Sequence, residues 1–204
     1  MRRRWRTWWR SRHPLVWWRL LVPENVTLVK LNAILQYAMG WLGGHLHEYV
    51  IGRLHYGVPD ENWPSLDPVI DERRMRLNTL VEHGARRFTY LYDFGDNWQH
   101  TVKIEDVVMP PNKGLRIRCI SGENACPPED VGGADAYFDF LAAITDPNHE
   151  EHASMLRWIS GSFFKGLVIR DANNVNAPRT PLLLVGSGRT PGYLKNLDHC
   201  REFS

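Results

Sequence analysis

The feature that most constrains this chain is the segment from Arg87 to Val107, which has the pattern of a β-hairpin. Apolar side chains alternate along both arms, first Phe88, Tyr90, Tyr92 and Phe94, then Trp98, His100, Val102 and Ile104. Because successive side chains of a strand point to opposite faces, each set lies on one face of its strand. The residues between the arms, Gly95 to Asn97, suit a tight turn, since Gly, Asp and Asn tolerate left-handed backbone. The segment therefore predicts a hairpin with one apolar and one polar face.

The rest of the chain alternates between helix and strand patterns. A stripe of apolar residues predicts a helix over 27–39, with Thr27 at its start and Gly40 at its end. Further helices are predicted over 134–145 and from Asp146-Pro147 onward. Strands are predicted over 16–22, 45–51, 53–56 and 115–120, and a short strand or turn over 74–80. These elements predict an α+β fold: an antiparallel sheet built from hairpins, with helices packed on one face.

The two ends of the chain differ in composition from the body. The first 22 residues carry seven arginines and no acid, and five of the nine tryptophans lie in the first 18 positions. The remainder has 18 basic against 23 acidic residues. We expect a basic Arg/Trp-rich arm over 1–13, which could contact nucleic acid or remain a solvated tail, one domain over 14–165 and a weakly ordered tail over 166–204.

Cysteine usage and hydropathy bear on the compartment. The odd, low number of cysteines does not form a disulfide framework and favours a reducing cytoplasm. No apolar run approaches the roughly 20 residues that span a bilayer, and arginines interrupt the N-terminal segment where a signal peptide would be apolar. We therefore expect a cytoplasmic protein that does not bind membranes.

The central hairpin also carries a resemblance. The string YLYDFGDNWQH (90–100) resembles the signature of the plasmid pRiA4b ORF-3-like family. Segments 14–23 (PLVWWRLLVP), 38–49 (AMGWLGGHLHEY) with Tyr56-Gly57, and 122–133 (GENACPPEDVGG) followed by 146–158 agree with it in order. The resemblance covers roughly residues 14–165. It implies an accessory or binding protein of plasmids or mobile elements. Some family members carried by insertion elements are labelled resolvase-like, but this sequence contains no recombinase motif.

Histidines and acids near the hairpin are candidate metal ligands. His45 and His47 are two residues apart on a predicted strand and share a face, and Asp93 and His100 flank the central turn. Imidazole and carboxylate groups are ligands of zinc, manganese and iron, so His45, His47, Asp93 and His100 predict a divalent transition-metal site. In the alternative interpretation, Asp93 and its neighbour Asp96 bind turn amides, and His100 packs among aromatic rings.

Three classes of function remain open. In a binding protein, the surface around the turn would contact nucleic acid or a protein partner through Tyr92, Asp93, Asp96, Trp98 and His100, with base stacking on the aromatic strand face. A protein partner could also pair with an exposed sheet edge near residues 16–22. In a metal-dependent enzyme, hydrolase-like in chemistry, the His/Asp set would act. Glu129 and Asp130, in the 122–133 segment, are expected to cap the following helix.

Overall fold

The computed structural model describes residues 16–59, 68–108 and 117–159, and the backbone of 182–188. These residues form an eight-stranded sheet in the order β4-β3-β2-β5-β6-β8-β1-β7. The strands are β1 (Trp17–Pro23), β2 (His47–Ile51), β3 (Leu54–Gly57), β4 (Val69–Asp71), β5 (Arg87–Tyr92), β6 (Trp98–Val108), β7 (Arg118–Glu123) and β8 (Leu182–Gly188). All neighbouring strands are antiparallel except β3 and β4, which are parallel.

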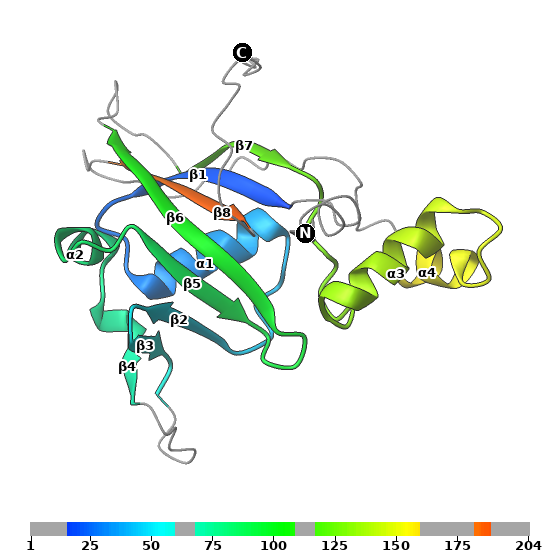
Figure 1. Ribbon diagram of the computed structural model, residues 1–204, viewed down its shortest axis with the longest axis horizontal. Coiled ribbons are helices and arrows are strands. Elements are labelled where there is room, and N and C mark those ends of the chain that lie inside the picture. The colour runs from blue at the N-terminus through cyan, green and yellow to red at the C-terminus, as the bar shows by residue number, and fades with distance from the viewer. Residues whose placement is uncertain (1–15, 60–67, 109–116, 160–181, 189–204) are drawn as a thin grey trace, which may run out of the picture.

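Helix α1 (Leu28–Met39) crosses one face of the sheet (Figure 1). Leu28, Leu31 and Leu35 are buried along its inner side, as the apolar stripe predicted. The Thr27 hydroxyl accepts a hydrogen bond from the Lys30 amide, and Gly40 ends the helix in the left-handed conformation. The predicted helix, its start and its end are confirmed.

The other helices lie at the margins of the sheet. Helix α2 (Leu77–Glu82) follows a short 3-10 turn, η1 (Glu72–Arg74), whereas helices α3 (Gly133–Thr145) and α4 (His152–Ile159) form a pair that projects to one side (Figure 1). In the described part of the chain, no helix combines the length and the apolar character needed to cross a membrane.

The buried core lies between α1 and the inner face of the central strands. Tyr49, Tyr90 and Tyr92 are among its largest fully buried side chains. The Tyr49 hydroxyl donates a hydrogen bond to the Leu28 carbonyl oxygen at 3.0 Å, which ties the sheet to the start of α1. The α+β class and both predicted hairpins, β2–β3 and β5–β6, are confirmed.

The structure corrects the predicted elements in several places. The segment 74–80, predicted as a short strand or turn, contributes its last residues to helix α2, which spans residues 77–82. The sequence pattern did not reveal this helix, because six residues are too few to show a helical period. The second C-terminal helix begins at His152, after a turn in which Asp146 accepts a hydrogen bond from the Asn148 amide. Strand β1 is not at an edge of the sheet, because β7 and β8 pair with its two sides.

The C-terminal tail is the largest correction. Residues 182–188, placed by the sequence in a weakly ordered tail, form β8 between β6 and β1. An apolar run of a few residues does not reveal a distant partner, and β8 joins strands more than 70 positions earlier in the chain. The predicted arm over 1–13 lies outside the described residues, as do the remaining parts of the tail.

Candidate metal centre

Three connecting segments meet at one end of the sheet, where β2 begins and β5 ends. They are the loop from α1 to β2 (41–46), the turn between β5 and β6 (93–97) and the loop from β7 to α3 (124–132). Each lies in one of the sequence segments that carried the family resemblance. The fold therefore brings together three motifs that are separated in sequence.

The hairpin turn is shaped by the side chain of Asp93. Its Oδ1 accepts hydrogen bonds from the backbone amides of Gly95, at 2.9 Å, and Asp96, at 3.3 Å. Asp93 and Asn97 both have positive φ, 54° and 55°, which Asp and Asn tolerate better than most residues. Asp93 is buried, and its Oδ2 is directed toward the loop that follows α1. The turn amides thus fix Oδ1 of Asp93, while Oδ2 remains directed toward the loop between α1 and β2.

The loop from β7 to α3 is fastened to the other two segments. The Trp41 indole donates a hydrogen bond to the Pro127 carbonyl oxygen at 2.8 Å. Glu129 accepts one hydrogen bond from the Leu42 amide, at 2.9 Å, and another from the Tyr92 hydroxyl. Both oxygens of Glu129 are therefore engaged in holding the loop.

A second contact seats the end of this loop on the hairpin turn. The Gly132 amide donates a hydrogen bond to Oδ2 of Asp96 at 3.0 Å. At Gly133, whose φ is +83°, a Cβ atom would lie 2.8 Å from the Asp96 carbonyl oxygen. Only glycine permits this close approach without displacing the backbone.

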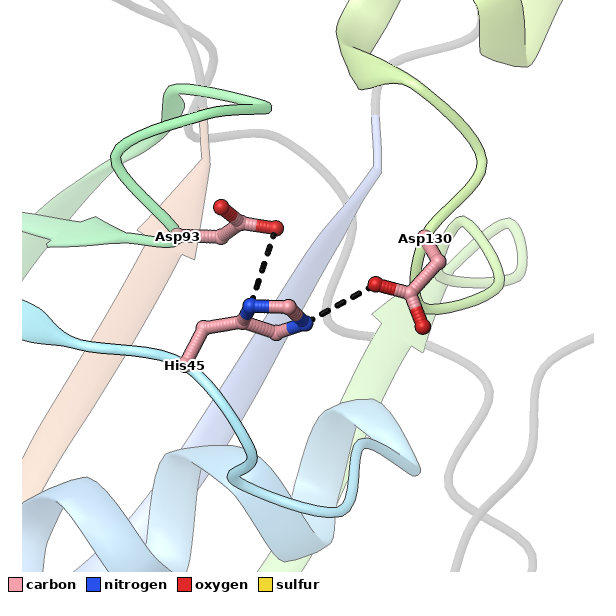
Figure 2. A group of neighbouring side chains, drawn as sticks. All are labelled: His45, Asp93 and Asp130. Carbon is pink, nitrogen blue, oxygen red and sulfur yellow. Dashed lines mark hydrogen bonds and ion pairs between the residues drawn. The ribbon is translucent and has the colours of Figure 1, made fainter.

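At the junction, the imidazole of His45 lies between two carboxylates (Figure 2). Its Nε2 is 2.9 Å from Oδ1 of Asp130, and its Nδ1 is 3.7 Å from Oδ2 of Asp93. One ligand-type atom from each of the three residues lies within 4.8 Å of the others. The side chain of Asp130 is 69% exposed and that of His45 36%, so the group is open to solvent.

The structure unites only part of the predicted metal set. His45 and Asp93 come together, but His47 and His100 do not join them. Nε2 of His47 lies 2.8 Å from Oε2 of the buried Glu72, on the side toward η1. The ring of His100 packs against those of Trp41 and Tyr90, with centroids at 5.5 and 5.8 Å. His45 lies in the loop before β2, so its side chain is free of the strand geometry that holds His47.

The predicted binding residues are divided between the core and the junction. Tyr92 and Trp98 are buried, and Trp41 stacks on Tyr92 with ring centroids 4.8 Å apart. Burial raises the pKa of Tyr92 above its ordinary value, and the hydrogen bond to Glu129 raises it further. These rings therefore pack against one another in the core beside the junction. Their burial leaves no exposed ring face on which a base could stack.

Asp130 is the residue that the sequence interpretation misplaced. Neither it nor Glu129 caps α3, since Gly132 occupies the cap position without a side-chain hydrogen bond. Asp130 has a positive φ of 62°, and its side chain is directed from the β7–α3 loop toward His45. Its place in the PPED string of a family-like segment was the available signal.

The fold and this junction define an α+β protein with a candidate metal site at one end of its sheet, where three motif-bearing segments of the sequence meet. Residues 9–171 match the plasmid pRiA4b ORF-3-like protein family, and the chain belongs to that family, as its motifs indicated.

Two similar proteins extend this finding. The chain is 43% identical over 151 residues to the uncharacterized protein y4hQ of Sinorhizobium fredii, covering 73% of this chain and 76% of that protein. The crystal structure of the protein of unknown function MM3350 from Methanosarcina mazei Go1 is similar, with a TM-score of 0.64 and 26% identity, covering 76% of this chain and 94% of that one.

Proposed function

We propose that this protein binds one divalent transition-metal ion, with His45 and Asp93 as ligands and Asp130 beside them. The observation that carries the proposal is the convergence of these three side chains from three loops. Imidazole nitrogen and carboxylate oxygen are the ligands of zinc, iron and manganese sites. A bound ion of this kind supplies Lewis acidity and an activated water, which is the chemistry of a metal-dependent hydrolase.

Local rigidity supports this assignment. The Asp93 carboxylate is fixed through Oδ1 by two turn amides, and Asp130 follows Glu129, which two hydrogen bonds hold in place. Ligands that are already held in position lose little conformational freedom when an ion binds. Asp96 and Glu129 add negative charge nearby, which favours a cation at the junction.

The test is the metal content of the purified protein, prepared without chelators and then offered Mn²⁺, Fe²⁺, Co²⁺ or Zn²⁺ in turn. We expect uptake of about one ion per chain for at least one of these metals. His45→Ala should abolish this binding. Asp93→Asn should do so without unfolding the turn, because the amide oxygen can still accept from Gly95 and Asp96 while an NH2 group replaces Oδ2.

A matched control is available on the face of the sheet that points away from the buried core. His55 and Glu48 form another histidine–carboxylate pair, 2.8 Å apart, without a third ligand-type group beside them in the described residues. His55→Ala should retain full metal content. A wild-type protein that takes up none of the four ions, or equal loss in His55→Ala and His45→Ala, would refute the proposal.

A nucleic-acid-binding role would depend on the basic arm, since the aromatic strand face is buried. Its support is the charge of the first 22 residues against an acidic remainder. Deletion of residues 1–13 should then abolish binding to single-stranded DNA, and binding by the full chain should weaken steeply with salt. Binding that survives the deletion would remove the arm from this role.

A further inference from the structure

The geometry points to a division of roles within the proposed metal centre: Asp130 is a positioning residue that orients the His45 imidazole, and the ion's remaining positions are open to an exogenous oxygen-donor ligand. This inference rests on the proposed function and adds to it which side chains coordinate and which class of molecule can enter. It is based on the hydrogen-bond partner and the distance to its nearest neighbour of each ligand-type nitrogen and oxygen at the junction.

The two nitrogens of His45 have different surroundings. Nε2 lies 2.9 Å from Oδ1 of Asp130, a normal distance for a hydrogen bond in which Nε2–H donates. Nδ1 lies 3.7 Å from Oδ2 of Asp93, too far for a hydrogen bond. With the proton on Nε2, two lone-pair-bearing atoms, Nδ1 and Oδ2, face each other across this gap, and a cation between them would turn their repulsion into attraction.

The width of the gap suits an ion. A nitrogen and an oxygen that each lie about 2.1 Å from a tetrahedral metal are about 3.4 Å apart. The observed 3.7 Å needs only a small closure of the two side chains. Figure 2 shows the imidazole edge and the Asp93 carboxylate directed toward each other, while Asp130 approaches from the other side of the ring.

Asp130 therefore occupies the place of a carboxylate partner rather than of a ligand. Metal-bound histidines commonly donate their second ring N–H to a carboxylate, which fixes the tautomer and the ring orientation. The neighbouring residue, Glu129, is not part of the group of ligand-type atoms at the junction, and its two oxygens already accept hydrogen bonds from the Leu42 amide and the Tyr92 hydroxyl. Asp130 thus acts on the ion through His45.

The described side chains leave some coordination positions of the ion free. Among the described residues, His45 Nδ1 and Asp93 Oδ2 are the atoms directed at the gap, whereas a closed structural zinc site has four protein ligands. Positions left open are filled by water or by an exogenous ligand. Because hard and borderline divalent ions favour oxygen, the class of molecule expected here carries a carboxylate, phosphate or hydroxamate group.

Substitutions at Asp130 separate positioning from coordination. In Asp130→Asn the amide oxygen can still accept the Nε2–H hydrogen bond, so Co²⁺ affinity should stay within about threefold of wild type and the visible Co²⁺ spectrum should be retained. Asp130→Ala removes the acceptor and should weaken binding by about 10- to 100-fold. Asp93→Asn, which removes a ligand, should weaken binding more than Asp130→Ala. The melting temperature of each metal-free variant reports separately on folding.

Open coordination is tested by adding acetohydroxamate, a bidentate oxygen donor, to the Co²⁺-loaded wild-type protein. A saturable change in the visible spectrum is expected, and the same change is expected in Asp130→Asn. Loss of binding in Asp130→Asn equal to that in Asp93→Asn would make Asp130 a ligand, and an unchanged spectrum would make the site closed. Either result overturns the inference while leaving metal binding itself intact. Absence of metal binding by the wild type would instead overturn the proposed function, and the inference with it.

Discussion

The seating of the β7–α3 loop on the hairpin turn can be tested by replacing Gly133 with alanine. A Cβ atom there would lie 2.8 Å from the Asp96 carbonyl oxygen, and the residue has a φ of +83°. The left-handed conformation costs a non-glycine residue about 1–2 kcal/mol. Displacing a packed backbone atom typically adds about 1–3 kcal/mol. Gly133→Ala should therefore lower the free energy of unfolding by about 2–5 kcal/mol.

Gly84 provides the matched control for this substitution. Its φ is +85°, almost the same, but a Cβ atom would meet nothing within 4 Å. Gly84→Ala should cost only the conformational part, about 1–2 kcal/mol, which the reduced entropy of the unfolded chain partly offsets. The difference between the two variants isolates the contact between the loop and the turn.

The assay is urea unfolding followed by tryptophan fluorescence, since Trp41 and Trp98 pack beside the junction. The denaturation midpoint of Gly133→Ala should fall clearly below that of Gly84→Ala, with an unchanged slope. Metal affinity should fall in Gly133→Ala alone, because the displaced loop carries Asp130 away from His45. Equal midpoints for the two variants would show that the loop does not sit on the turn as described, and the reasoning would be refuted.

Three other outcomes follow from the buried polar groups. Tyr92→Phe should destabilise the protein by about 1.5–3 kcal/mol, because the Glu129 carboxylate loses its hydroxyl donor; the same loss in a Glu129→Ala background, where no acceptor remains, would contradict this pairing in a double-mutant cycle. His47→Ala should cost about 3–5 kcal/mol in urea unfolding by leaving Glu72, which is 2% exposed, without its partner. Metal content should nevertheless remain at wild-type level in the folded variant, and its loss would return His47 to the site. Burial raises the pKa of Tyr49 and Tyr90 above the ordinary tyrosine value. Their phenols stay protonated in the folded state where the unfolded chain ionises, so the unfolded state binds fewer protons and stability should fall as pH rises above about 10. Urea midpoints across this range, with phenolate absorbance beside them, provide the measurement; a midpoint independent of pH would refute the burial argument.

Much of the local structure could be predicted because it depends on neighbours in sequence. The alternation along residues 87–107 defined the central hairpin, and the stripe and caps of residues 27–40 defined α1. Such patterns follow from the strand period of two and the helical period of 3.6, which any single segment displays. The family could also be assigned from ordered motifs, since these strings are read directly from the chain. Asp93 and His45 could be proposed as ligands from their residue types and positions.

Long-range pairing required the tertiary structure. Strand β8 could not be placed between β6 and β1 from its own sequence, because an apolar run indicates burial without naming a partner. The same applies to the candidate site. His47 has the residue type of a ligand, but its strand directs it to Glu72, while Asp130 joins His45 only because a loop 85 residues away in sequence is fastened to the hairpin turn. Composition and spacing thus determined which groups the chain contains and which elements carry them. The packing of one loop against another decided which groups meet, because that packing depends on distances through space that sequence separation does not encode.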